Sequence, residues 1–440
     1  MAKIYRRIVV VCAIFALFTH LSIYLSSPDA ISLSPWFWIA GFAVAALPFY
    51  LSPESFNLVK RSPLPLWGYG FVLLSGTWLL VQGKTSEITW QEFRLRIFSS
   101  VLLSVMLVIF ATPEARIWAR RAIVAAVLFA VALNIFEMFN PMTFSNSQGR
   151  SAGLYVIATQ SGEALVVGMI LGIGALPHRY RLLFALIAGS GVLMTFSRGP
   201  LFGWLLAVAI LFKTGQISAK RSLMIAGGCA VLVVLLTIVF WQPLMNKLLD
   251  FGMLNQDVAT RMEGFVNPDQ FGTDESSLRR REVVAYSWQL FKERPLLGHG
   301  VAASKEWDFY MGPHNQYLAL MVDHGILGLF ILPLLLLAVV WRARGEARHL
   351  GWAVGVFTIF EGWFSHTVLN DHYMILSFAL LSSMAVGSRF ETTGQIQIEK
   401  ADRKIPTFRS GIPDVDGSNF EQLQNAWNPF SNSTHKFGVK

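Results

Sequence analysis

The sequence has few charged residues for its length. Asp, Glu, Lys and Arg make up 14% of its 440 residues, whereas hydrophobic residues make up 54% and the mean hydropathy is +0.49. This composition excludes an ordinary water-soluble domain and indicates an integral membrane protein. The net charge of +9 does not indicate nucleic-acid binding, because the basic residues fall in short clusters between apolar runs.

Cysteine is nearly absent as well. Cys12 and Cys229 both lie within apolar runs, which argues against a disulfide framework and against a thiolate metal site. The sequence also shows neither the alternating pattern of barrel strands nor an internal repeat of about 20 to 50 residues. Barrels and repeat arrays are therefore excluded from the expected folds.

Long apolar runs dominate what is present. Each is expected to be helical, because lipid offers no hydrogen-bond partner for exposed backbone groups. At 1.5 Å per residue, runs of this length cross about 30 Å of hydrocarbon. The sequence predicts an all-α integral membrane protein with about twelve transmembrane helices, near residues 8–26, 35–51, 64–82, 95–112, 117–138, 153–175, 181–197, 200–213, 222–243, 317–341, 350–367 and 373–388.

The loops between these runs differ in charge. One alternate set holds about three times as many Lys and Arg residues as the other, which places both termini in the cytoplasm. Four parts follow. Transmembrane helices occupy residues 1–243 and 317–388, a long periplasmic loop with short helices occupies 244–316, and a cytoplasmic tail occupies 389–440. The tail is expected to be disordered because it has few large aliphatic residues.

Two arginines oppose this charge pattern. Arg150 precedes Ser-Ala-Gly, and Arg198 stands in Ser-Arg-Gly-Pro, both at span ends on the sparsely charged face. Charge at such a place opposes membrane insertion, so it indicates a function. An arginine that reaches toward lipid headgroups accounts for each position equally well.

The long loop adds further basic residues. Arg279, Arg280 and Arg281 precede an amphipathic helix predicted over 283–292. The helix dipole favours acidic groups at a helix start, so three arginines there suggest an anionic partner, with solvated surface charge as the alternative. His314 follows where the loop meets the next apolar run. Imidazole suits proton transfer near neutral pH, although an isolated interfacial histidine is more often structural.

The arginines and His314 together indicate a function more strongly than any one of them alone. Several arginines can hold a diphosphate through bidentate, charge-assisted hydrogen bonds. A histidine beside them can take the proton of an acceptor hydroxyl. Such a set makes metal-free glycosyl transfer from a diphosphate-linked donor chemically sensible.

Other polar residues lie in or near the apolar runs. Three carboxylates are expected to pair with neighbouring spans, namely Glu137, Glu163 and Glu361. A last external loop gathers His366, Asp371 and His372, but their spacing matches no metal-ligand motif. No metal site is predicted.

Several short motifs resemble the signature of the bacterial O-antigen ligase and O-antigen polymerase superfamily. Besides Arg150 and Arg198, they are the stretch from Arg280 to Pro295-Leu296-Leu297-Gly298-His299-Gly300, then His314-Asn315-Gln316-Tyr317-Leu318 and Gly325-Ile326-Leu327-Gly328. The chain departs from that pattern at residues 156–160, where many relatives carry Asn-Pro-Asn, and at Asp323, where Glu is usual.

The resemblance implies a C-type membrane glycosyltransferase of the bacterial inner membrane that needs no cofactor, metal or nucleotide sugar. It would transfer a polysaccharide from undecaprenyl diphosphate to a lipid A-core hydroxyl on the periplasmic face, with inversion, and would contact membrane lipids. His314 would activate the acceptor. The diphosphate would be held and neutralised by Arg150, Arg198 and Arg280, flanked by Arg279 and Arg281, with Asn315, Tyr317 and Glu163 in support.

Two alternatives stay open. A polymerase of the same superfamily would use the same donor and add it to a growing glycan on the lipid carrier. A lipid-linked sugar transporter without catalysis would also suit a chain with many spans. Such a transporter would be expected to show inverted repeats and broken helices near the membrane midplane.

Overall fold

The computed structural model describes residues 2–26, 31–83, 85–218, 275–307 and 312–404. Within these residues all regular structure is helical, which confirms the predicted fold class. The chain divides into two units, Met1–Phe390 and Glu391–Lys440. The contacts that build the candidate site all belong to the first unit.

Several helices are extended or joined by short helical turns. A π-helical turn at Ile14–Phe18 extends the first helix, and 3-10 turns follow at Gly153–Tyr155, Ile173–Ala175 and Gly325–Leu327. In chain order the α-helices are α1 (Ala2–Ala13), α2 (Leu21–Tyr24), α3 (Pro35–Tyr50), α4 (Pro53–Arg61), α5 (Leu64–Val81), α6 (Glu87–Ile109), α7 (Pro113–Phe139), α8 (Ala158–Gly172), α9 (His178–Met194), α10 (Arg198–Lys213), α13 (Glu275–Glu293), α14 (Gln316–His324), α15 (Gly328–Val340), α16 (Gly345–Glu361) and α17 (His372–Lys404).

The apolar runs of the sequence fall on these helices. The run predicted at 222–243 lies outside the described residues, as do the loop residues 244–274 and the tail from 405 onward. Each of the other predicted runs coincides with one helix or with consecutive helical pieces. α17 continues past residue 388, where the last span was predicted to end, as far as Lys404.

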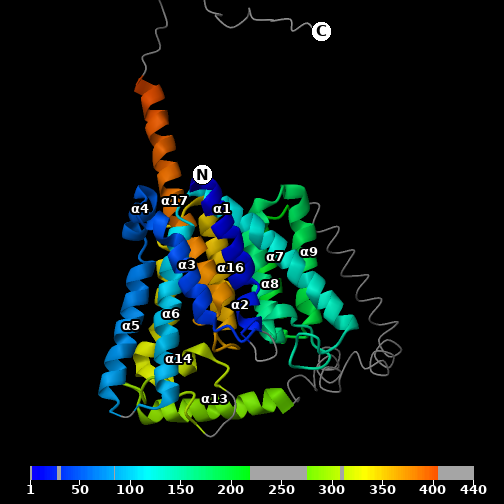
Figure 1. The fold of residues 1–440 in the computed structure, drawn as a ribbon, viewed down its shortest axis with the longest axis vertical. Coiled ribbons are helices and arrows are strands. Elements are labelled where there is room, and N and C mark those ends of the chain that lie inside the picture. The colour runs from blue at the N-terminus through cyan, green and yellow to red at the C-terminus, as the bar shows by residue number, and fades with distance from the viewer. Residues whose placement is uncertain (1, 27–30, 84, 219–274, 308–311, 405–440) are drawn as a thin grey trace, which may run out of the picture. The chain divides into compact units, whose positions relative to one another are not determined.

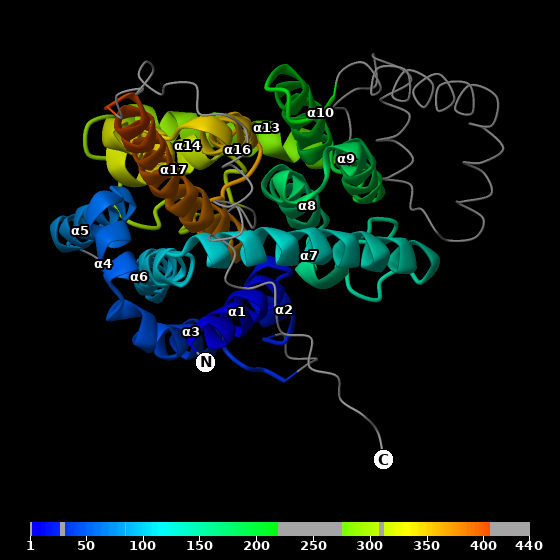
Figure 2. The same cartoon turned by 90° about the horizontal axis from the view of Figure 1, so that it is seen from above.

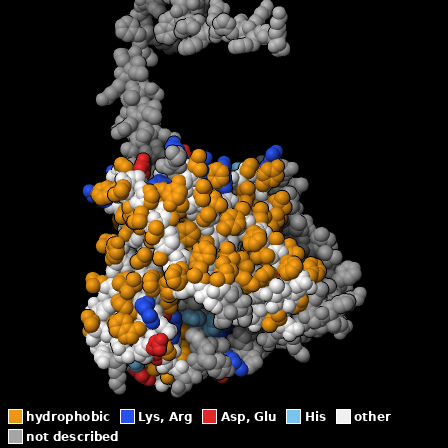
Figure 3. Space-filling view, in the orientation of Figure 1, with side chains coloured by type: hydrophobic (Ala, Val, Ile, Leu, Met, Phe, Trp, Pro, Cys, Tyr) orange, Lys and Arg blue, Asp and Glu red, His pale blue; other side chains and the backbone are white. Residues whose placement is uncertain are grey.

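Several helices are suited to a membrane. Four stretches of the described chain are long and apolar enough to cross one, namely α5, α7, Ala158–Ala175 and Gln316–Val340. A fifth is added if α3 and α4, bent by 109°, count as one broken span. Hydrophobic side chains cover the middle of the face seen in Figure 3, with charged side chains toward its two ends. The total of about twelve spans remains a prediction.

α8 is the central helix. It packs against α7, α9, α10 and α16, and 78% of its apolar window is buried. A helix that is apolar on all sides is expected in such a place. Figure 2 shows α7 between α1 and α2 on one side and α8 and α9 on the other. Helix α13 runs across the lower end of the bundle (Figure 1).

A side-chain cap fixes the start of α14. Asn315 has an extended backbone, and its Oδ1 accepts a hydrogen bond from the backbone N–H of Leu318 at 3.0 Å. The backbone N–H of Gln316 donates to the carbonyl oxygen of Gly362 at 2.7 Å, just after α16 ends. The residue before this cap, His314, is thereby held beside the end of α16.

Candidate functional site

Arginines from three separate stretches of chain line one pocket. Arg150 lies in the loop after α7, Arg198 is the first residue of α10, and Arg280 lies in α13. The carboxylate of Glu361, at the end of α16, lines the same pocket. The structure therefore brings together three guanidinium groups that are far apart in sequence.

Hydrogen bonds fix two of these arginines. Arg150 donates from Nε to the carbonyl oxygen of Thr195 at 3.1 Å and from Nη2 to Oγ of Ser197 at 2.7 Å. Arg198 donates from Nη1 to Oγ of Ser277 in α13 at 3.4 Å. The first link ties the loop after α7 to the turn before α10, and the second ties α10 to α13.

Glu137 organises the loop that carries Arg150. Its carboxylate, buried at the end of α7, accepts hydrogen bonds from the backbone N–H groups of Phe144, Ser145, Ala152 and Gly153. Glu137 thus pairs with backbone amides and not with a neighbouring span. These four hydrogen bonds hold the backbone on both sides of Arg150. They therefore fix the direction in which the Arg150 side chain points.

The helical register of α13 separates the three neighbouring arginines. Arg280 lines the pocket, whereas Arg281 is exposed and Arg279 is partly exposed. Neither flanking arginine is among the described residues that line the pocket. Successive residues of an α-helix point about 100° apart, so only one of three consecutive side chains can face a given partner.

His314 lies close to Arg280 and His366. The imidazole rings of His314 and His366 are perpendicular, with centroids 5.1 Å apart. Burial, the positive charge of Arg280 and the His366 ring lower the pKa of His314 to about 3. The imidazole is therefore neutral at physiological pH, and the nearby positive charge of Arg280 makes it a weaker base than a free histidine. His314 itself is not among the described residues that line the arginine pocket.

The residues expected to support the site have distinct contacts. Tyr317 donates from its hydroxyl to the carbonyl oxygen of Ile359 at 3.2 Å and packs against Trp363. Asn315 acts as the helix cap. Both therefore hold α14 in place near the end of α16.

Glu163 is buried next to the pocket and does not line it within the described residues. Its Oε2 accepts a hydrogen bond from the Tyr373 hydroxyl at 2.7 Å, and the same hydroxyl lies 3.1 Å from Oδ2 of Asp371. Asp371 also accepts from Nε2 of Gln160 at 2.9 Å. Glu163 therefore links α8 to the start of α17, and Glu361 is the carboxylate that faces the arginines.

The three polar residues of the loop before α17 point to different partners. His366 packs against His314, Asp371 joins the Glu163 cluster, and His372 lies 3.3 Å from Oγ of Ser22. Within the described ranges, the structure holds no group of three or more His, Cys, Asp or Glu residues that could bind a metal ion.

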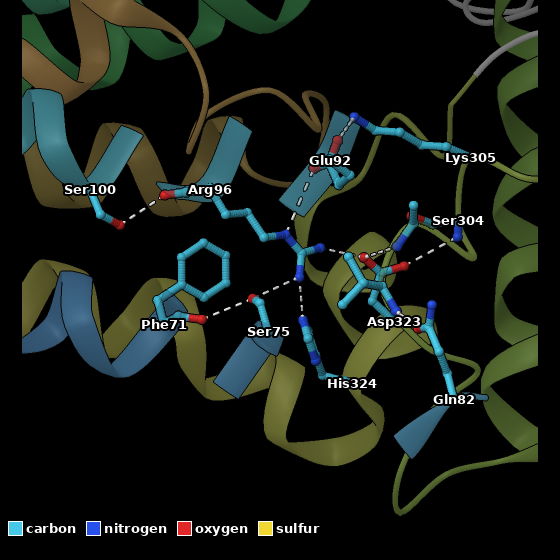
Figure 4. A network of polar contacts seen from close by, with 12 residues as sticks. Phe71, Ser75, Gln82, Glu92, Arg96, Ser100, Ser304, Lys305, Asp323 and His324 are labelled. Carbon is cyan, nitrogen blue, oxygen red and sulfur yellow. Dashed lines mark hydrogen bonds and ion pairs between the residues drawn. The ribbon is translucent and has the colours of Figure 1, made fainter. Parts of the chain in front are cut away.

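Sequence reasoning missed a second polar network, drawn in Figure 4. Arg96 of α6 is only 3% exposed. It donates to Oδ2 of Asp323 at 2.5 Å, to Oγ of Ser75 at 3.0 Å and to Nε2 of His324 at 2.6 Å. Asp323 in turn accepts from the backbone N–H of Ser304 at 3.2 Å. The network ties the end of the loop between α13 and α14 to α5, α6 and α14.

The glycines of the signature motifs explain how this loop end fits. The backbone N–H of Gly300 donates to the carbonyl oxygen of Asp323 at 3.1 Å, and that of Ile326 donates to the carbonyl oxygen of Pro295 at 2.8 Å. Gly298 has a φ of +70°, and a Cβ there would lie 2.6 Å from the Asp323 carbonyl oxygen. A Cβ at Gly325 would lie 2.3 Å from the carbonyl oxygen of Leu296. The backbone of the Pro295–Gly300 motif is therefore in direct contact with the backbone of the Gly325–Gly328 motif.

Taken together, these features define a helical membrane protein with an arginine-lined pocket at one end of its bundle. A family model described as O-antigen ligase matches residues 182–333. Over these residues the match confirms the resemblance of the loop motifs to the O-antigen ligase and polymerase superfamily. It spans Arg198, Arg280 and His314, and it indicates an activity of the ligase or polymerase type. No curated protein matches the chain.

Proposed function

We propose that this protein transfers a glycan from undecaprenyl diphosphate to a lipid A-core hydroxyl, as an O-antigen ligase of the bacterial inner membrane with its active site on the periplasmic face. The observation that carries the proposal is the meeting of Arg150, Arg198 and Arg280 in one pocket, next to the neutral imidazole of His314. Three guanidinium groups suit a diphosphate in charge and in hydrogen-bond geometry.

The proposed reaction is a single displacement. The acceptor oxygen forms a bond to the anomeric carbon while its proton passes to the His314 imidazole. The bond between the anomeric carbon and the diphosphate oxygen breaks, and its electron pair leaves with undecaprenyl diphosphate. The arginines neutralise the negative charge that develops on this leaving group. Attack opposite to the leaving group inverts the anomeric configuration. Metal ions and nucleotide sugars take no part in these steps.

Glu361 gives the pocket a second property. It is fully buried and faces Arg280, and a Cβ at Gly199 would lie 3.1 Å from its Oε1. The positive charge of Arg280 acts on Glu361 and favours its ionised form. We infer that the diphosphate replaces Glu361 as the partner of Arg280 when the donor binds.

The second candidate function is a polymerase that adds the same donor to a growing glycan. The family match supports both, since it indicates ligase or polymerase activity. The two reactions share the donor and the leaving group and differ only in the acceptor. The pocket described above concerns the donor.

Deletion of the gene separates these functions. A ligase deletion leaves long glycan chains on undecaprenyl diphosphate, a polymerase deletion leaves single repeat units, and loss of a transporter traps the glycan on the cytoplasmic side. Complementation with His314→Ala should reproduce the deletion, whereas His299→Ala should restore the wild-type glycan. His299 is a matched control because its ring bonds to the Leu290 carbonyl oxygen in the same loop. Full complementation by His314→Ala would remove the base assignment.

A further inference from the structure

A groove lies between α15 and α16, which run antiparallel and are joined by residues 341–344. Its volume of about 460 Å³ is within the range of small-molecule sites in proteins. Apolar side chains such as Leu337, Trp352 and Ile359 line most of it, and Arg342 and Arg348 line one end. The groove is therefore apolar along most of its length and basic at one end.

The groove opens toward the outside of the bundle. The side chains of Leu337, Trp352 and Ile359 are 56%, 59% and 45% exposed. Because α15 belongs to a stretch suited to crossing a membrane, such exposed apolar side chains face lipid. Gly355 leaves the middle open, since no described atom lies within 4 Å of a Cβ placed there. A hydrocarbon chain can enter from the side.

The basic end carries more positive charge than its two lining arginines. Arg344 lies in the same turn, and Arg389 bonds to the carbonyl oxygen of Trp341. Burial and the charges of Arg342, Arg344 and Arg61 lower the pKa of Arg389. Guanidinium groups from three separate parts of the chain thus act on one another at this end.

The acidic residue of this turn does not offset that charge. Glu346 accepts hydrogen bonds from Nη1 and Nη2 of Arg120 at 3.0 and 2.7 Å. Its carboxylate is therefore engaged on the α7 side. Arg342 and Arg348 line the groove end, and their positive charge favours an anion there.

We propose that this groove binds an anionic phospholipid. Its phosphate lies between Arg342 and Arg348, and one acyl chain lies along Leu337, Gly355 and Ile359. Charge complementarity at one end and an apolar, lipid-facing trough along the rest fit this molecule, as basic pockets between spans do in general.

The basic end of the groove is distant from the arginine pocket. α16 begins next to Arg342 and ends at Glu361, which lines that pocket. With 1.5 Å of rise per residue, the two ends of α16 are about 25 Å apart. The proposed phosphate position is therefore at the opposite end of α16 from Glu361.

Native mass spectrometry of the delipidated full chain in detergent tests the proposal. Titration with phosphatidylglycerol and with phosphatidylcholine should show tighter binding of the anionic lipid. The double variant Arg342→Gln/Arg348→Gln should weaken phosphatidylglycerol binding by about 30-fold and leave phosphatidylcholine binding unchanged. A matched control removes two exposed arginines outside the groove, Arg121→Gln/Arg179→Gln, and should retain wild-type affinity.

A second variant tests the apolar part. Gly355→Phe fills the trough and should weaken both lipids, with the thermal midpoint of unfolding measured to verify folding. Equal affinity of the wild type for the two lipids would overturn the proposal. So would full retention of phosphatidylglycerol by the Arg342→Gln/Arg348→Gln variant, or an equal loss in the control variant, which would indicate a response to net charge alone.

Discussion

The guanidinium of Arg96 and the carboxylate of Asp323 meet at 2.5 Å, with both side chains buried. The two residues are 227 positions apart in the sequence. Removing one partner of a buried ion pair leaves an uncompensated charge, which costs about 3–5 kcal/mol. Arg96→Met should therefore lower the stability of the purified protein sharply, as measured by thermal unfolding in detergent.

Two comparisons make the Arg96 prediction specific. The double variant Arg96→Met/Asp323→Leu should recover part of the loss, because no buried charge is left without its partner. Lys3→Gln breaks the exposed ion pair with Glu114 at 3.5 Å and should change the midpoint little. If Arg96→Met were as harmless as Lys3→Gln, the network would not hold the loop.

The pH dependence of the reaction should report the environment of His314. Its pKa of about 3 keeps the imidazole neutral far below its ordinary range. The acidic limb of the kcat/KM profile, which reports the free enzyme, should therefore lie well below pH 6.5. Arg280→Gln removes a positive charge that lowers this pKa, so the limb should move to higher pH even though the rate falls. An acidic limb near pH 6.5 in the wild type would show that the pKa of His314 is not lowered.

The register of α13 predicts which arginine matters. Arg280→Ala removes a charge from the pocket and should reduce donor turnover by about 100-fold. Arg281→Ala removes the same charge from an exposed neighbour and should change turnover little. Turnover of a lipid-linked donor by the purified variants measures both. Equal losses would mean that net charge, and not the position of Arg280, attracts the donor.

The sequence predicted well what local patterns decide. Apolar runs predicted helices because lipid leaves the backbone no other choice, and this class was confirmed. Arg150 and Arg198 stood out because they oppose the charge bias of the loops, and the structure places both at one pocket. A property visible within a few residues was enough for each of these predictions.

Long-range pairing was beyond the sequence. Arg96 stands at the start of an apolar run and looked like one more loop charge, since nothing near it indicates Asp323. Glu137 was expected to pair with a neighbouring span, but it accepts hydrogen bonds from backbone amides. Glu361 interacts with Glu163 of the neighbouring helix α8 and also faces the arginines. The partner of a buried carboxylate depends on how the helices pack. The residues next to it in the sequence do not indicate that partner.

The contact between the two glycine motifs leads to a prediction with an internal control. Gly298 and Gly215 have almost the same φ, +70° and +71°. A Cβ at Gly298 would lie 2.6 Å from the Asp323 carbonyl oxygen, whereas no described atom lies within 4 Å of a Cβ at Gly215. Each Gly→Ala substitution incurs the left-handed strain of about 1–2 kcal/mol, and only Gly298→Ala adds a backbone clash. Thermal unfolding should therefore show a larger loss for Gly298→Ala, together with lower transferase activity, because the clash moves the loop end away from α14. Equal losses in the two variants would mean that the motifs do not need this close approach.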